Sequence, residues 1–417
     1  MSTNSTAKAP PLLDRSDERY QVETGIGGAI RTFIDKVKAG DLGSLPVIVG
    51  LAIIWTVFQS INPIFLSSTN LINMLFDAST IGVISLGIIC ILMVGEIDLS
   101  VGSVSGFASA IVGVLWVNHG WPVGWAIAAA VATGALIGLL YAQLFNRFGM
   151  PSFVSTLAGL LAVLGGQLYV LGGTGSINLP YDSPLVNLGQ SLFMPAFVAY
   201  GLVAIAGIAM FVAGLKTVAR RRAAGLSAES MGRLVLRSAV LTIVLELIAL
   251  YFYQDRGIPW LFGIFIGLVV GLDYALTRTQ WGRMVNAVGG NREAARRAGI
   301  KVRTIYTSVF VLCASLAAFG GVMASARLAS ASQQAGTGDV NLNAIAAAVI
   351  GGTSLFGGRG SAYSALLGII VIQSISSGLT LLDLSSSLRY MITGAVLAVA
   401  VIVDSLARQS RVSHGRA

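Results

Sequence analysis

The chain is poor in the residue types on which most enzymes and disulfide scaffolds depend. Its 417 residues include two cysteines, and charged residues make up 11% of the chain, whereas soluble domains carry about 25%. Cys90 and Cys313 both lie in apolar stretches and are too few for a disulfide framework. The scarcity of charge excludes an ordinary soluble protein, and the scarcity of polar residues excludes a disordered chain.

Histidine and nucleotide-binding motifs are similarly scarce. The two histidines, His119 and His414, have no ligand partner at metal-binding spacing and no serine and aspartate that would complete a triad. No GxxxxGK[ST] segment is present to hold nucleotide phosphates. We therefore expect that the chain is not an enzyme, binds no metal and holds no cofactor of its own.

Apolar residues are abundant instead, at 55% of the chain with a mean hydropathy of +0.80. About 20 consecutive apolar residues cross a bilayer as a helix. The sequence therefore predicts an all-α polytopic membrane protein with about 12 spans, in a range of 10–12. We place them near residues 45–65, 72–95, 101–118, 124–146, 152–172, 195–215, 236–253, 258–277, 303–327, 342–357, 361–380 and 388–406.

The net charge of +9 is explained by topology rather than by nucleic acid, because the basic residues gather in a few interruptions between spans. One basic cluster runs from Lys216 to Arg237 and another from Arg278 to Arg303, whereas Tyr169 to Ala213 holds no Lys or Arg. The first 44 residues contain no apolar core typical of a signal peptide. We expect a cytoplasmic segment 1–44, a transmembrane domain 45–406 and a cytoplasmic tail 407–417.

Glycines interrupt the ends of the second and tenth predicted spans, and we expect short or broken helices there. Irregular backbone within a membrane survives where it is buried in protein or lines a wet cavity. Close packing is the alternative for any one glycine, since GxxxG spacing such as Gly134/Gly138 or Gly263/Gly267/Gly271 lets helices approach. The candidate translocation-path or broken-helix positions are Glu96, Asp98, Ser100, Gly102, Gly351, Gly352 and Thr353.

Acidic residues inside apolar stretches are the other polar signal, because an ionised carboxylate in hydrocarbon is costly. They are Asp77, Glu96, Asp98, Glu246 and Asp273. Asp98 or Ser100 is a candidate cap for the helix that follows, and a direct role in translocation is the alternative. Most of the other spans carry no charge, which argues against a proton- or sodium-driven carrier.

The polar interruption from Thr277 to Arg303 contains a short basic amphipathic segment, Gly289 to Ile300. Asn291 is its expected N-cap and Gly299 its C-terminal stop. Such a helix suits a contact with a soluble motor protein, although a helix on the anionic membrane face would use the same arginines.

Four sequence blocks resemble one family. Glu293-Ala294-Ala295 followed by Gly299 resembles the EAA loop of ABC-importer permeases, and the segments 94–103, 150–159 and 342–355 are similar to blocks of the ribose/xylose-type sugar permeases. The resemblance covers about residues 45–406. Glu96 stands where members commonly have Gly, and the xylose permeases are the members that carry Glu there. The helical pair around 195–253 is similar to an additional pair in those same permeases.

The resemblance implies a permease fold with a cytoplasmic coupling helix, cytoplasmic termini and a place in a bacterial inner membrane. The coupling residues it implies are Asn291, Arg292, Glu293, Ala294, Ala295, Arg296 and Gly299. It implies a second permease copy, a periplasmic sugar-binding protein and an ATPase subunit that holds ATP and Mg. The implied cargo is xylose or a related pentose, with another small cargo such as a nucleoside, or an ion-coupled carrier, as alternatives.

Overall fold

The computed structural model describes residues 45–385 except residue 227, together with 387, 388, 391–395, 398 and 402. The predicted terminal segments 1–44 and 407–417, and most of the twelfth predicted span, lie outside the described residues. The chain divides into two compact units. Met194–Gly257 is called the hairpin unit here, and the remaining described residues form the bundle unit.

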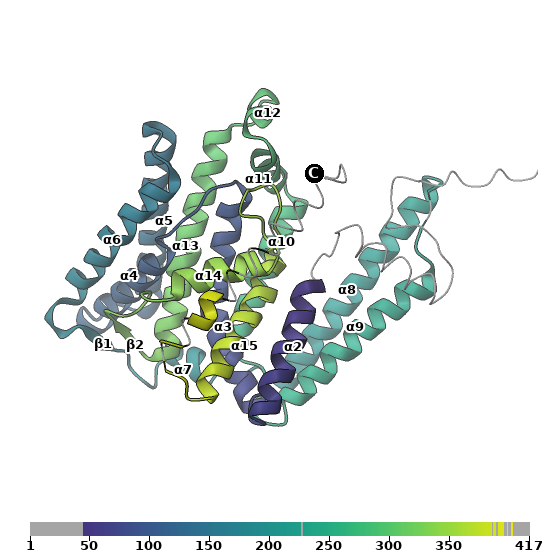
Figure 1. Cartoon of the computed structure of the whole chain (residues 1–417), viewed down its shortest axis with the longest axis horizontal. Coiled ribbons are helices and arrows are strands. Elements are labelled where there is room, and N and C mark those ends of the chain that lie inside the picture. The colour runs from purple at the N-terminus through teal and green to yellow at the C-terminus, as the bar shows by residue number, and fades with distance from the viewer. Residues whose placement is uncertain are drawn as a thin grey trace, which may run out of the picture. The chain divides into compact units, whose positions relative to one another are not determined.

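Helices of the bundle unit account for nearly all of its regular structure (Figure 1). The long ones are α3 (Ser68–Met93), α5 (Val123–Phe148), α6 (Ser152–Leu171), α10 (Trp260–Arg278), α13 (Val302–Leu328) and α15 (Ala362–Leu381). The shorter ones are α2 (Leu45–Ile61), α4 (Val101–Gly113) with the π-helical turn Val114–Asn118, the 3-10 turn Gly172–Thr174, α7 (Pro184–Gln190), α11 (Gln280–Gly290), α12 (Arg292–Arg297) and α14 (Val340–Ile350). The all-α prediction misses one small antiparallel sheet, which pairs β1 (Ser176–Asn178) with β2 (Ser330–Ser332).

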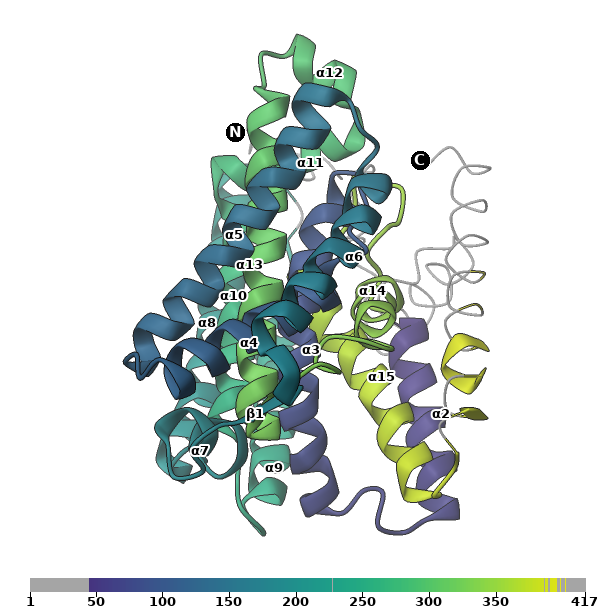
Figure 2. The same ribbon diagram turned by 90° about the vertical axis from the view of Figure 1, so that its left-hand side faces the viewer.

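The core of the bundle unit lies where α13 packs between α3 and α5, and Figure 2 shows α5 and α13 side by side. Glycines make the approach possible. A Cβ atom at Gly134 would lie 2.6 Å from the carbonyl oxygen of Ala314, and one at Gly138 would overlap the carbonyl oxygen of Phe310. The GxxxG spacing of this pair thus brings two helix backbones into contact.

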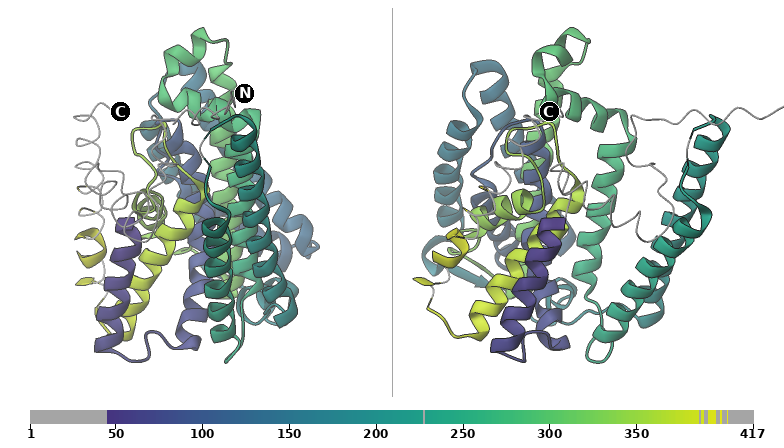
Figure 3. Two further views of the ribbon diagram at one scale, coloured as in Figure 1. Left: turned by 90° about the vertical axis from the view of Figure 1, so that its right-hand side faces the viewer. Right: turned by 45° about the vertical axis from the view of Figure 1, so that its right-hand side comes forward.

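Helix α15 packs against α2 on another side of the bundle unit (Figure 3). The indole nitrogen of Trp55 donates a hydrogen bond to Ser374 at 2.8 Å, and the Phe58 ring fills the space beside Gly378. Helix α14 lies crosswise to these helices and contacts both α3 and α15 (Figures 1 and 2).

The hairpin unit consists of two antiparallel helices, α8 (Ala196–Ala223) and α9 (Met231–Phe252). They approach each other where Gly207 faces Thr242 and Gly214 faces Leu234. The predicted helical pair is therefore present. Its basic cluster lies mostly in the ends of the two helices rather than in a loop, because α8 continues through Arg222 and α9 begins before Arg233.

Nine helices in the described residues are long and apolar enough to cross a membrane. The first and tenth predicted spans are shorter, as the apolar helices Pro46–Ile61 and Val340–Ile350. The short tenth helix agrees with the expectation, because it ends at Ile350 before two glycines, although the predicted bounds 342–357 are too long. The second span differs from the expectation, since it is an unbroken helix to Met93 and the break follows it.

Candidate functional site

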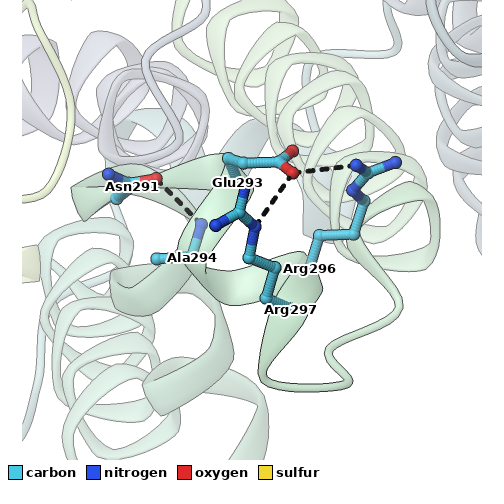
Figure 4. A network of polar contacts seen from close by, with 5 residues as sticks. All are labelled: Asn291, Glu293, Ala294, Arg296 and Arg297. Carbon is cyan, nitrogen blue, oxygen red and sulfur yellow. Dashed lines mark hydrogen bonds and ion pairs between the residues drawn. The ribbon is translucent and has the colours of Figure 1, made fainter.

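Helix α12 begins and ends as its sequence predicts. The side-chain oxygen of Asn291 accepts a hydrogen bond from the Ala294 N–H at 2.9 Å, which is an N-cap (Figure 4). At the other end Gly299 has a φ of +85°, and the Ile300 N–H donates to the Ala295 carbonyl oxygen at 3.1 Å. Glycine reaches this backbone conformation without a steric penalty, so the helix stops here in a Schellman motif.

Three charged residues of α12 interact along its exposed side. Glu293 accepts hydrogen bonds from Arg296 at 2.8 Å and from Arg297 at 3.4 Å (Figure 4). The hydrogen bond from Arg296 is the main reason that the pKa of Glu293 lies below its ordinary value. Ion pairs between side chains so exposed contribute little to stability, and the three residues form a charged, exposed surface.

The two alanines of the helix have different surroundings. Ala295 is 4% exposed and faces the bundle unit, whereas Ala294 is exposed. Arg292 lies over two rings of neighbouring helices, 5.7 Å from the centre of Phe145 and 5.3 Å from that of Tyr306. Ala295 and Arg292 thus hold α12 to its own chain, and Ala294, Arg296 and Arg297 are exposed.

The first break is the segment between α3 and α4, and two of its backbone N–H groups donate to side chains of α6. The Ile97 N–H donates to Ser152 at 3.4 Å and the Leu99 N–H to Thr156 at 3.1 Å. These bonds explain how non-helical backbone is accommodated between two apolar helices, since each buried N–H needs an acceptor.

Asp98 is fully buried within this break. One of its oxygens accepts from both the N–H and the hydroxyl of Ser100, each at 2.7 Å, and the other lies 3.9 Å from the Cys313 sulfur. Ser100 occupies the N-cap position of α4 but its side chain makes no capping hydrogen bond. Asp98 therefore fixes the turn that precedes α4, and the capping hypothesis is wrong for Ser100.

The remaining predicted residues of the first break lie at its two ends. Glu96 is half-buried and precedes Ile97, whose N–H donates to Ser152. At the other end the Gly102 N–H donates to the side chain of Asn341, and a Cβ atom at Gly102 would overlap the Gly336 carbonyl oxygen. Both ends thus contact segments that are distant in sequence.

The second break runs from Gly351 to Ser361, between α14 and α15. Gly351 is buried against the Ser364 carbonyl oxygen, so the two helices meet there backbone to backbone. Gly352 has a φ of +102° and faces open space. Thr353 is buried, and its hydroxyl has no hydrogen-bond partner in the described part of the chain.

The two breaks meet through backbone atoms. The Gly358 N–H donates to the Met93 carbonyl oxygen at 2.9 Å, and a Cβ atom at Gly357 would lie 3.0 Å from the Gly95 nitrogen. Sequence reasoning missed Thr156, Cys313 and Asn341, which hold the first break in place. Thr156 was already visible in one of the four sequence blocks, whereas only the fold shows the roles of the other two.

The sequence of the chain matches one protein family and several known permeases. The family described as "Branched-chain amino acid transport system / permease component" matches residues 70–401. The chain belongs to this family of ABC-importer permeases. It is 33% identical over 347 residues to the xylose transport system permease protein XylH of Escherichia coli K12, with 83% of this chain and 87% of that protein covered.

Further relatives extend the similarity over nearly the same length. The XylH protein of Haemophilus influenzae is 31% identical over 89% of this chain and 98% of its own. The ribose import permease protein RbsC of Bacillus subtilis is 29% identical, with 88% of this chain and 94% of that protein covered. No solved structure matches the chain.

Membership makes this permease a multi-pass transport subunit of a bacterial inner membrane, without catalytic activity of its own. ABC-importer permeases work with an ATPase and a binding protein.

The other acidic residues in apolar stretches differ in whether they form an ion pair. Asp77 forms an ion pair with Arg327 at 2.9 Å, and the same guanidinium lies 4.8 Å from the centre of the Phe76 ring. This pair joins α3 to the end of α13. Glu246 and Asp273 make no ion pair among the described residues.

Proposed function

We propose that this permease translocates a monosaccharide, xylose or a related pentose, across the inner membrane. The observation that carries the proposal is the 33% identity to a xylose permease across 83% of the chain, together with the weaker similarity to ribose permeases. In the proposed assembly two copies of the permease form the pathway, a separate ATPase pair hydrolyses ATP, and a binding protein delivers the sugar.

Uptake by a reconstituted system tests the cargo and the energy source. Proteoliposomes that contain the permease and its ATPase should take up labelled xylose when the binding protein is added outside and ATP is enclosed in the lumen with the ATPase. An ionophore should leave this uptake unchanged. Uptake that persists without the ATPase and collapses with the ionophore would instead identify an ion-coupled carrier, and a nucleoside taken up in preference to xylose would contradict the sugar assignment.

The proposed orientation places residues 1–44, α12 and the tail 407–417 in the cytoplasm and the β1–β2 end in the periplasm. The distribution of basic residues supports it, since the segment from Tyr169 to Ala213 has none. A reporter fused within 176–191 should be periplasmic and one after Arg297 cytoplasmic. The reverse result contradicts the orientation.

We also propose that α12 is the helix that docks into the ATPase. Its support is the exposed surface formed by Ala294, Arg296 and Arg297, beside the buried Ala295 that anchors the helix. Ala294→Trp should abolish co-purification of the ATPase while the permease stays folded, because the new ring points away from the bundle unit. Ala295→Trp is the contrasting variant, and it should lower the stability of the permease itself.

The breaks are the proposed lining of the sugar pathway, with Glu96, Asp98, Ser100, Gly102, Gly351, Gly352 and Thr353 as candidate positions. Their support is the Thr353 hydroxyl, which has no hydrogen-bond partner among the described residues, and the interruption of two apolar helices at neighbouring places. Thr353→Val, which keeps the shape and removes the hydroxyl, should weaken xylose uptake with the ATPase still bound. Unchanged uptake would remove Thr353 from the pathway.

A further inference from the structure

Three segments meet at the end of the bundle unit that carries α12. They are Met93–Gly95 after α3, Gly289 near the end of α11, and Phe356–Gly358 in the second break, and together they are called the glycine junction. A Cβ atom at Gly289 would overlap the Met93 carbonyl oxygen, and the Gly358 N–H donates to that same oxygen. A Cβ atom at Gly357 would lie 3.0 Å from the Gly289 oxygen.

These contacts involve backbone atoms, so they have little capacity to adjust. A flexible side chain can absorb a shift of its neighbour by changing rotamer, whereas two backbones in van der Waals contact move together or separate. Gly95, Gly357 and Gly358 have φ values of +79°, +86° and +75°. These conformations favour glycine, and the absence of a Cβ atom is what lets the segments approach so closely.

The glycine junction is connected to α12 by a short path. Gly289 is followed by Gly290 and by Asn291, the N-cap of α12. Arg292, the first residue of the helix, lies over the Tyr306 ring, 5.3 Å from its centre. The Tyr306 hydroxyl is 3.5 Å from the Val94 carbonyl oxygen. Backbone and side-chain contacts therefore both join α12 to the first break.

We infer that the glycine junction transmits movement of α12 to both breaks, with Gly289 as the positioning residue that keeps the three segments in register. The inference rests on the proposed docking role of α12. A displacement of α12 by the ATPase would carry Gly289 with it, and the contact with the Met93 oxygen would pass that displacement to the end of α3 and, through Gly358, to the second break.

Gly289→Ala and Gly290→Ala form a matched pair that tests the inference in the assembled importer. Both residues lie in α11, but a Cβ atom at Gly290 has nothing within 4 Å. Gly289→Ala should lower ATP-driven xylose uptake about tenfold, in the range of coupling changes that single substitutions produce. It should still co-purify with the ATPase and hydrolyse ATP, and Gly290→Ala should transport as the unmodified permease does.

Equal uptake by the two variants would overturn the inference, and so would loss of ATPase binding in Gly289→Ala, since Gly289 would then act on docking. Arg292→Gln is a second variant that adds no volume to the junction, and it should lower uptake with the ATPase retained. The docking proposal fails by a different result, an Ala294→Trp permease that keeps its ATPase. The two failures are therefore distinguishable.

Discussion

Helices α3 and α8 are similarly apolar, yet they occupy opposite environments within their own units. In α3, 89% of the most apolar stretch is buried inside the structure, and in α8 only 11% is buried. Hydropathy identifies both as candidate spans but does not tell which helix faces protein and which leaves its surface for lipid or for another chain. The difference arises from the number of neighbours, because α3 packs against α10, α13, α14 and α15 within the bundle unit, whereas α9 is the neighbour of α8 within the hairpin unit.

The largest expected effect is on folding, when a large side chain replaces a closely packed glycine of the bundle unit rather than a glycine of the hairpin unit that faces open space. Gly138→Leu in α5 would drive a side chain into the Phe310 carbonyl oxygen, whereas Gly201→Leu in α8 has nothing within 4 Å of its Cβ atom. Overpacking typically costs about 1–3 kcal/mol and more where backbone must move. We expect Gly138→Leu to abolish the monodisperse peak in size-exclusion chromatography in detergent, and Gly201→Leu to preserve it. Equal monodisperse peaks for the two variants would show that the bundle unit is loosely packed.

The same contrast explains what the sequence predicts and what it does not. Gly134/Gly138 and Gly267/Gly271 share one spacing, but only the first pair contacts another helix, and the second faces open space. Local signals were reliable, as Asn291 and Gly299 show at the ends of α12. The burial of Ala295 and the contact of Gly289 with Met93 depend on segments that are distant in sequence, so no local pattern contains them.

Substitutions of two acidic residues, one in each unit, should have an intermediate effect on stability. Asp98 in the bundle unit accepts two hydrogen bonds from Ser100, whereas the Glu246 carboxyl in α9 accepts no hydrogen bond from the described residues. Asp98→Leu leaves a buried N–H and hydroxyl unsatisfied, at about 1–3 kcal/mol each. Asp98→Asn keeps an acceptor and should lose much less stability.

Glu246→Leu removes a carboxyl group from an apolar helix and should leave the thermal unfolding temperature unchanged or raise it. Unfolding of the purified permease, followed by a thiol-reactive dye at the buried cysteines, ranks the three variants. A destabilised Glu246→Leu protein would show that this carboxylate has a partner, and equal unfolding of Asp98→Leu and Asp98→Asn would show that the Ser100 bonds contribute nothing.

The smallest expected effect concerns Glu293, which lies outside the apolar spans of both units. Hydrogen bonds from Arg296 and Arg297 lower the pKa of this carboxyl from its ordinary value of 4.5. A carboxyl whose folded-state pKa is lowered stabilises the fold at pH values above its ordinary pKa, and the contribution disappears as the pH falls through the lowered value. At neutral pH the bonds at the start of α12 are therefore fully formed, and acid should release them.

A carbon-13 NMR titration of glutamate-labelled permease measures this directly, with Glu293→Gln identifying the signal. Arg296→Gln should raise the pKa of Glu293 toward its ordinary value more than Arg297→Gln does, because the Arg296 bond is 2.8 Å long and the Arg297 bond 3.4 Å. Equal shifts would mean that both arginines act only through their charge. Neither variant should change the unfolding temperature measurably, since exposed ion pairs of this kind contribute little to stability.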